Sequence, residues 1–429
     1  MAQRSLKILF CVWGGWGNNE SPYQSAFVSG DRIGSRKVAE GLAKRGHDVH
    51  FFSLANENKD TKVAGVTVRF RKNPHRLSTR ERDRLSGAEL FSKYFQAFVD
   101  GLNELCRKES FDLLMARTVF PTASGAALVA QGRKIPLVTT VAERDFLSFF
   151  AAKGFPPKVP ASLTNGRVVH HAQHTFHLAS ESTCRAEFQG YVRKVFESSA
   201  GIVVLDEHLI ADIEQITKRH APVAVVPDGV DIELFAKKRF KIDSDLRAYR
   251  GQTIIACVAR TGPYKRQDLL LKSAARIIAE YPKVRIWIIG EGPYLDFLKK
   301  ISKREGMGDR VKFWGLQSHS RIAQLLSLSS IVVCPTDTEG LPLNLLEGMA
   351  ARRAVLASDI APFDHWIQNR RTGMLAKNDV SGFTQALRYL LSHEKERQVM
   401  AERAFQKIRK FTWENSVQGT ESAIRSFLN

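Results

Sequence analysis

Two glutamates, Glu339 and Glu347, flank a stretch whose residue types and spacing predict an anion-binding site. An apolar strand predicted at Ser330–Cys334 stops at Pro335, because proline has no N–H to give to the ladder of a sheet. A short polar loop and the start of a helix follow, where free amides and the helix dipole favour a negative charge. The residues expected to line this site are Gly340, Leu341, Pro342 and Leu343.

Carboxylates do not bind an anion, so the two glutamates need another task. Glu339 falls in the loop and Glu347 on the helix, where each can accept hydrogen bonds from hydroxyls on either side of a phosphate. A nucleotide-sugar has this layout, with sugar hydroxyls, a diphosphate and ribose hydroxyls in order. The same pair also fits the acid and base of a glycosidase, or an ordinary loop and helix that bind nothing.

Two cations follow another predicted strand, Thr253–Ala259, and precede a predicted helix. Arg260 offers a planar fork of donors and Lys265 a point charge. At the end of a parallel strand, the two can hold a diphosphate as it leaves. An exposed basic loop without a ligand is the alternative.

Three further segments stand at or near predicted strand ends. Gly290 and Gly292 follow one strand directly, and glycine allows a backbone to approach a ligand closely. Without a third glycine they are a weak dinucleotide fingerprint. The other two segments are Pro227–Asp231, with the sequence PDGVD, and Phe313–Gln317, with the sequence FWGLQ.

In this order along the chain, the motifs resemble those of the retaining glycosyltransferases of family four. The E-x7-E spacing of Glu339 and Glu347 is the main feature, and the resemblance is close in the second half of the chain and loose in the first. It implies the GT-B fold and transfer of a sugar from a UDP- or GDP-sugar to an acceptor hydroxyl, with retention of the anomeric configuration. The expected partners are the nucleotide-sugar donor and a hydroxyl acceptor: a cell-surface glycan, a lipid-linked sugar or a small molecule. The resemblance implies no cofactor and no metal ion.

The resemblance also implies residue roles. Arg260 and Lys265 would stabilise the charge that develops on the diphosphate. Glu339 would accept hydrogen bonds from the sugar, and Glu347 from the ribose. The segments expected to contact the donor through their backbone are Gly290, Gly292, Leu316 and Gln317.

Several positions depart from the family pattern. Arg266 stands where the family usually has glycine, and Asp228 where it has asparagine. Ala142 stands where many members have a histidine that reaches the sugar, so Glu143 or Arg144 is expected to substitute for it. Gly30 corresponds to the glycine-rich loop of the first domain, expected near the acceptor or a phosphate.

Short apolar strands alternate with helical stretches through both halves, which predicts an α/β protein with two Rossmann-like, doubly wound parallel sheets. Strands are expected at Lys7–Val12, Asp48–Ser53, Val66–Arg71, Asp112–Ala116, Leu137–Val141, Gly201–Leu205, Val223–Val226, Thr253–Ala259, Arg285–Ile289, Val311–Trp314, Ser330–Cys334 and Ala354–Ala357. An N-terminal acceptor domain is expected at residues 1–205 plus 412–429, and a C-terminal donor domain at 206–411. In the GT-B fold the two face a central cleft.

The net charge and the cysteines of the chain indicate its classes of partner and its compartment. A net charge of +20 attracts polyanions but does not choose among nucleic acid, anionic lipid and nucleotide-linked substrates. The cysteines are scattered and odd in number, which predicts buried thiols in a reducing compartment. No apolar run approaches the roughly 18 residues of a membrane-spanning helix. A cytoplasmic location is expected, with the inner face of the membrane as a peripheral site.

Two other patterns carry alternatives. A basic stretch, Arg69–Arg84, precedes the aromatic residues of Phe91–Phe98, which fits a membrane-surface element or a solvated loop before a core helix. His170, His171, His174 and His177 fit a metal site less well than an ordinary helix.

Two alternative functions stay open. One is a sugar-nucleotide epimerase or phosphorylase of the same fold. The other is a basic module that binds nucleic acid or membrane without catalysis. No recognisable nucleic-acid motif occurs, so nucleic acid is not an expected partner.

Overall fold

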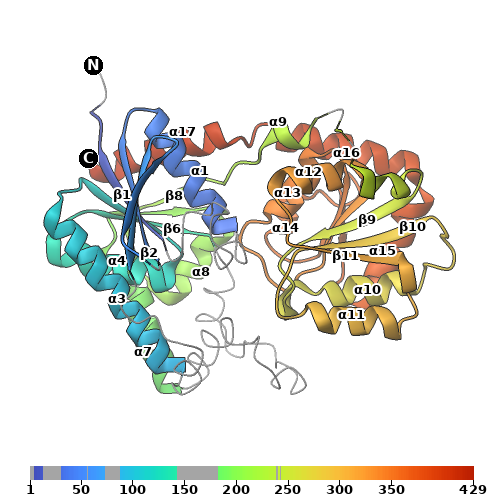
Figure 1. Cartoon of the computed structure of the whole chain (residues 1–429), viewed down its shortest axis with the longest axis horizontal. Helices are drawn as coiled ribbons and strands as arrows, with labels where there is room; N and C mark the ends of the chain where they lie inside the picture. Colours follow the sequence, from blue (N-terminus) through green and yellow to red (C-terminus); the bar gives the residue numbers. More distant parts are fainter. Residues whose placement is uncertain are drawn as a thin grey trace. The chain divides into compact units, whose positions relative to one another are not determined.

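The computed structural model describes residues 4–12, 30–55, 57–72, 87–142, 182–237, 240–241 and 243–429. The chain forms two compact units (Figure 1). Unit 1 comprises Met1–Asp228 and Trp413–Asn429, and unit 2 comprises Gly229–Thr412. In sequence, unit 2 is therefore an insertion in unit 1.

Unit 1 is built on an eight-stranded sheet with the order β3-β4-β2-β1-β5-β6-β7-β8. Its strands are β1 (Lys7–Cys11), β2 (Asp48–Ala55), β3 (Lys59–Val63), β4 (Val66–Lys72), β5 (Leu113–Arg117), β6 (Leu137–Val141), β7 (Gly201–Val204) and β8 (Val223–Val225). Neighbouring strands are parallel except β3, which pairs antiparallel with β4 at the edge. β3 was not predicted, because its sequence, KDTKV, is almost entirely polar.

Helices cover both faces of this sheet (Figure 1). α1 (Gly30–Lys44) packs beside α17 (Trp413–Leu428) on one face. The other helices are α3 (Gly87–Lys108), α4 (Ser124–Arg133), α7 (Ser182–Ser198) and α8 (His208–Ile216), with a short π-helical turn, η2 (Val119–Ala123), before α4. Val38 and Leu42 of α1 and Ile424 of α17 are buried in one apolar cluster with Phe10 of β1. The C-terminal helix thus completes the core of the first unit.

The expected domain boundary at residue 205 is wrong. β8 begins at Val223 and pairs in parallel with β7, so the chain after residue 205 still belongs to the first sheet. Unit 1 therefore extends to Asp228 before the chain leaves it.

Unit 2 is built on a six-stranded parallel sheet with the order β11-β10-β9-β12-β13-β14. Its strands are β9 (Thr253–Val258), β10 (Val284–Ile289), β11 (Val311–Gly315), β12 (Ile331–Cys334), β13 (Ala354–Ser358) and β14 (Met374–Ala376). β14 was not predicted, because its three residues are too few to show a pattern.

The helices of unit 2 also lie on both faces of its sheet (Figure 1). On one face, α10 (Gln267–Ala275) packs against α11 (Leu295–Arg304) and α15 (Val380–Ser392). On the other, α13 (Leu343–Ala350) packs against α16 (Glu394–Ile408) and α9 (Ile232–Phe235), which also contacts α12 (His319–Leu328). Shorter elements are α14 (Phe363–Trp366), η4 (Ser244–Tyr249), η5 (Pro263–Lys265) and η6 (Gly308–Arg310). The predicted fold class, two doubly wound α/β units, is confirmed.

Four cysteines in the described part of the chain are buried free thiols: Cys11, Cys106, Cys257 and Cys334. Burial raises the pKa of Cys257 to about 12, against the opposing charge of Lys265. Such thiols stay protonated and behave as small apolar side chains.

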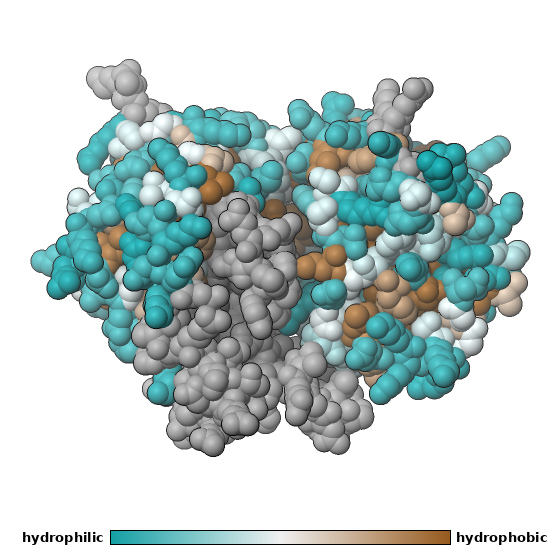
Figure 2. Space-filling view, in the orientation of Figure 1, coloured by the Kyte–Doolittle hydropathy of each residue, from teal (hydrophilic) through white to brown (hydrophobic). Residues whose placement is uncertain are grey.

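The face of the molecule in Figure 2 is mostly hydrophilic, with hydrophobic residues in small separate areas. Within the described residues, the helices are too short or too polar for any of them to cross a bilayer.

Candidate active site

The carboxyl ends of β9 and β12 bring the predicted cations and carboxylates together. The two strands are parallel neighbours at the centre of the unit 2 sheet, so the loops that follow them leave at one edge. The Tyr264 carbonyl, from the first loop, accepts from the Asp337 amide at 2.8 Å and from the Thr336 hydroxyl at 3.0 Å. The side-chain amide of Asn344, on α13, also donates to the Val258 carbonyl, at 2.8 Å. The two loops therefore form one connected surface.

Lys265 and Glu339 form an ion pair at the centre of this surface. Lys265 Nζ lies 2.7 Å from Glu339 Oε2, and the two side chains are only 16% and 14% exposed. Partial burial strengthens such a pair relative to a surface pair. A diphosphate and a sugar could each replace one partner of the pair, because a phosphate accepts from lysine and a hydroxyl donates to glutamate.

Gly290 and Gly292 hold a turn against the Arg260 loop. Their φ angles are 132° and 154°, and a Cβ on Gly290 would lie 2.1 Å from the Ala259 carbonyl oxygen. A Cβ on Gly292 would lie 2.3 Å from the Thr261 carbonyl oxygen. The expected close approach exists, but it is to the protein's own backbone. Larger residues would push away the loop that carries Arg260.

The start of α13 is tighter than the sequence suggests. Gly340, Leu341 and Pro342 are buried, and Leu343 is partly buried. The Leu343 amide donates to the Leu341 carbonyl at 2.9 Å, and the Leu345 amide to the Pro342 carbonyl at 2.9 Å. These bonds use two amides of the first turn, so an anion here would have to meet the remaining ones.

Glu347 has a histidine partner, His319, that was not predicted from the sequence. His319 Nε2 lies 2.8 Å from Glu347 Oε1, and Glu347 is almost buried. The His319 ring also makes an edge contact with Phe235, with centroids 5.0 Å apart. Glu347 is therefore held in one orientation from a neighbouring helix. The sequence signal was absent because the pair is 28 residues apart.

The segment expected to contact the base follows β11. Leu316 is 37% exposed, one of the few large apolar side chains with such exposure in the described part of the chain. The Gln317 side chain donates to the Trp314 carbonyl at 2.6 Å, so its amide group is turned back onto its own strand. An exposed apolar side chain suits contact with the face of a planar ring.

Comparison with known proteins decides the family. The model of glycosyl transferases group 1 matches residues 238–407, and the model of the glycosyl transferase 4-like domain matches residues 32–229. Together they span most of both units. The chain belongs to the family-four glycosyltransferases.

Relatives and solved structures agree with this assignment. The N-acetyl-alpha-D-glucosaminyl L-malate synthase of Bacillus anthracis is 22% identical over 88% of each chain. A D-inositol 3-phosphate glycosyltransferase of Corynebacterium urealyticum is 26% identical over 54% of this chain and 58% of its own. The structure of sucrose-phosphate synthase from Thermosynechococcus elongatus superposes with a TM-score of 0.74 at 16% identity over 98% of each chain. HepE from Anabaena, in complex with UDP and glucose, gives a TM-score of 0.71 at 16% identity over 98% of this chain and all of its own. These likenesses show the GT-B fold.

Arg266, the departure from the usual family-four glycine, adopts a left-handed backbone with φ 48°. Glycine takes this conformation without strain, which accounts for the family preference. In this glycosyltransferase, Arg266 keeps the conformation and adds ion pairs to Asp337 at 2.7 Å and Asp268 at 3.4 Å.

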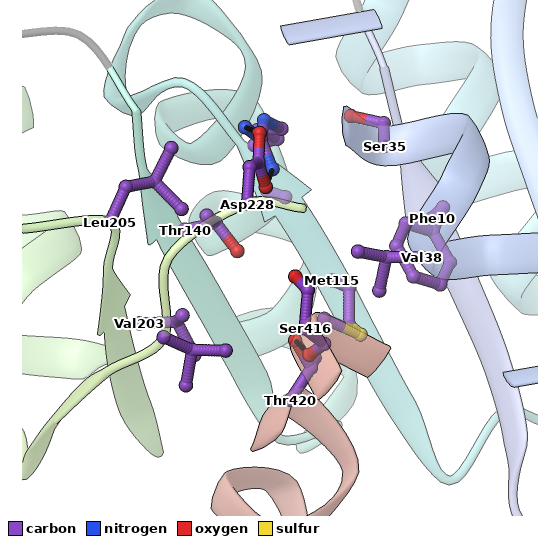
Figure 3. Close-up of a pocket in the computed structure, with 13 residues that line it drawn as sticks. Phe10, Ser35, Val38, Met115, Thr140, Val203, Leu205, Asp228, Ser416 and Thr420 are labelled. Carbon is purple, nitrogen blue, oxygen red and sulfur yellow. Dashed lines mark hydrogen bonds and ion pairs between the residues drawn. The ribbon is translucent and has the colours of Figure 1, made fainter. Parts of the chain in front are cut away.

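Asp228, the other departure, is buried in unit 1. It forms a two-pronged ion pair with Arg117 of β5, with one contact of 3.1 Å between Arg117 Nη1 and Asp228 Oδ1. A pocket beside this pair has an internal space of about 10 Å³, no more than a single water molecule needs. Hydroxyls of Ser35, Thr140 and Ser416 line it (Figure 3). Arg117 was not predicted as a site residue, because its partner Asp228 is 111 residues away in the sequence.

The remaining predicted features lie outside the described residues or differ from the prediction. α1 begins at Gly30, but the side chains at its start are outside the described set, and so are Glu143 and the histidine run. Arg69 and Arg71, at the start of the basic stretch, both pair with Asp60 at 2.5 Å, so this part is better balanced than the sequence suggests. Among the described residues, no three His, Cys, Asp or Glu side chains are arranged to hold a metal ion.

Proposed function

We propose that this family-four glycosyltransferase transfers a sugar from a UDP- or GDP-sugar to an acceptor hydroxyl, with retention of the anomeric configuration. The observation that carries the proposal is the Lys265–Glu339 pair beside the Arg260 loop. The pair brings a cation suited to a diphosphate and a carboxylate suited to a sugar hydroxyl together at the carboxyl ends of β9 and β12, which supports the proposal.

The proposed chemistry follows from where charge develops. The bond between the anomeric carbon and the diphosphate oxygen breaks, and its electron pair stays with the diphosphate. Arg260 and Lys265 stabilise this negative charge, and the start of α13 adds its dipole. Glu339, released from Lys265, accepts hydrogen bonds from the sugar.

The acceptor oxygen then forms a bond to the anomeric carbon on the same face. The departing phosphate oxygen takes the acceptor proton, so atoms and charges balance without a separate protein base. Glu347, held by His319 at 2.8 Å, accepts from the ribose hydroxyls and fixes the other end of the donor.

The comparisons support the donor class by analogy. HepE has been solved with UDP and with UDP-glucose. The acceptor of this chain is proposed only as a hydroxyl of a glycan, a lipid-linked sugar or a small molecule.

Calorimetric titration with UDP and GDP tests the proposal, at a physiological ionic strength of about 0.15 M. We expect one nucleotide to bind, and the Lys265→Ala variant to bind it more weakly. Lys299→Ala is the matched control, because Lys299 pairs with Asp296 on α11 and not with Glu339. If the wild-type protein bound neither nucleotide, the donor assignment would fail.

Product analysis with donor alone separates the alternatives of the same fold. An epimerase converts the donor without an acceptor, whereas the proposed transferase leaves the sugar unchanged apart from slow hydrolysis. A peripheral membrane site is tested by sedimentation with anionic vesicles at low salt, where binding is strongest. Absence of the protein from the pellet would remove the membrane surface from its partners.

A further inference from the structure

Two consecutive cations, Lys265 and Arg266, reach two different carboxylates of the loop after β12. Lys265 contacts Glu339 at 2.7 Å, and Arg266 Nη1 contacts Asp337 Oδ1 at 2.7 Å. The left-handed backbone of Arg266 turns the two side chains apart, so that neighbours in sequence serve separate partners. Two ion pairs thus connect the same two loops.

The Arg266 pair belongs to a larger network of hydrogen bonds. Asn378, which follows β14, donates from Nδ2 to Asp337 Oδ1 at 2.7 Å. The Ser358 hydroxyl, at the end of β13, lies 3.1 Å from Asn378 Oδ1. Asp337 is therefore tied to the turn before α10 on one side and to the ends of two other strands on the other.

The charge of Arg266 is stabilised in this network. Burial favours the neutral form of the guanidinium, but the hydrogen bonds and charges of Asp337 and Asp268 outweigh it and raise its pKa. The Asp337 amide is also engaged, because it donates to the Tyr264 carbonyl at 2.8 Å. Side chain and backbone of Asp337 together fasten the carboxylate loop to the cation loop.

We propose that Arg266 and Asp337 are positioning residues that keep the Lys265 and Glu339 loops in register while the Lys265–Glu339 pair opens for the donor. This inference rests on the proposed function, in which a diphosphate takes Lys265 and a sugar takes Glu339. Once that pair opens, the connection through Arg266, Asp337 and Asn378 keeps the two groups the right distance apart. Arg266 gives up the conformational freedom of glycine and gains a second ion pair between the two loops.

The Arg266→Gly variant separates this role from a conformational one. Glycine suits φ 48° better than arginine, so backbone strain falls and the melting temperature should hold or rise. Nucleotide affinity should nevertheless fall about 10-fold, the scale of one charge-assisted hydrogen bond. A purely structural residue would move stability and affinity in the same direction. Arg266→Lys, which keeps a cation, should recover part of the affinity.

A matched control and a second variant complete the test. Arg388→Ala removes an exposed arginine pair with Glu280, far from this loop in sequence, and should change affinity by less than about twofold. Asp337→Asn should weaken binding as Arg266→Gly does, and the double variant should be no weaker than either single one. Equal affinity of the Arg266→Gly variant and the wild-type protein for UDP or GDP would overturn the inference.

Hydrogen exchange distinguishes its failure from failure of the proposed function. The Asp337 amide should exchange faster in Arg266→Gly, whether or not any nucleotide binds. If the wild-type protein binds neither UDP nor GDP, the proposed function falls. Unchanged protection of the Asp337 amide in the variant would overturn the positioning role by itself.

Discussion

Two ion pairs of similar composition have opposite settings in the two units. In unit 1, Arg117 and Asp228 are 8% and 2% exposed and meet through two contacts. In unit 2, Lys265 and Glu339 meet through one contact and keep about twice the exposure of Arg117. A buried, two-pronged pair cannot exchange partners without stranding a charge, whereas a more exposed pair can. The difference separates a pair that holds the fold from a pair that can receive a ligand.

The largest effect should come from breaking the buried pair. Arg117→Met removes the buried guanidinium that Asp228 contacts, which costs about 3–5 kcal/mol in the free energy of unfolding. Denaturant unfolding followed by circular dichroism measures it. The double variant Arg117→Met, Asp228→Leu should recover most of the loss, because no charge is then stranded. A loss below about 1 kcal/mol in the single variant would mean that the two pairs do not differ as described.

Breaking the half-buried pair should affect turnover instead. Lys265→Ala and Arg260→Ala should each lower turnover on the order of 10²-fold, because charge aimed at the leaving diphosphate is lost. The free energy of unfolding of each variant should fall by less than that of Arg117→Met, because Lys265 and Glu339 are more exposed than Arg117 and Asp228. Turnover within about twofold of wild type would contradict the diphosphate role.

A second carboxylate of unit 1, Glu421, sharpens the contrast through pH. Burial of Glu421 on α17 would raise its pKa, but hydrogen bonds from Arg45, Arg425 and His47 outweigh this and lower the pKa to about 2. A lowered pKa in the folded state stabilises the protein at pH values above the ordinary glutamate pKa. This contribution, about 1–3 kcal/mol, is lost as the pH falls from about 4.5 towards 2. The acid-unfolding curve of Glu421→Gln should be flatter over that range, and a curve as steep as that of wild type would exclude Glu421 as its cause.

The smallest effect concerns the partner of Glu347. His319→Ala should weaken nucleotide binding by about 5-fold, the scale of one hydrogen bond that orients the carboxylate. His319→Gln, which keeps a donor, should lose less. Calorimetry with the nucleotide that binds the wild-type protein measures both. If His319→Ala binds it unchanged, Glu347 does not need the histidine to meet a ribose.

Local patterns allowed the prediction of much of this molecule. Strands such as β9 and β12 are short apolar runs, and the motifs after them belong to the loops that the same strands end in. For that reason Arg260, Lys265, Glu339 and Glu347 could be predicted to share one site, and the structure brings Lys265 and Glu339 into contact. Their family assignment followed from the same order of motifs.

Contacts across elements could not be predicted in this way. His319 with Glu347, Arg117 with Asp228, and Arg266 with Asp337 are joined only by the packing of separate strands and helices. No periodicity marks such a partner in the sequence. The boundary error had a related cause, since the short strand β8 reveals its sheet only by pairing with β7.

The crossing of the chain between the units has a consequence for biosynthesis. The chain leaves unit 1 after Asp228 and returns at Trp413, and the Val230 amide donates to the Phe411 carbonyl where the two crossings meet, at 2.9 Å. Because a ribosome makes the chain from the N-terminus, all of unit 2 emerges before α17, which supplies Val417 and Ile424 to the core of unit 1. The unit whose synthesis begins first is therefore completed last. Until α17 emerges, the side of α1 that packs against α17 stays uncovered.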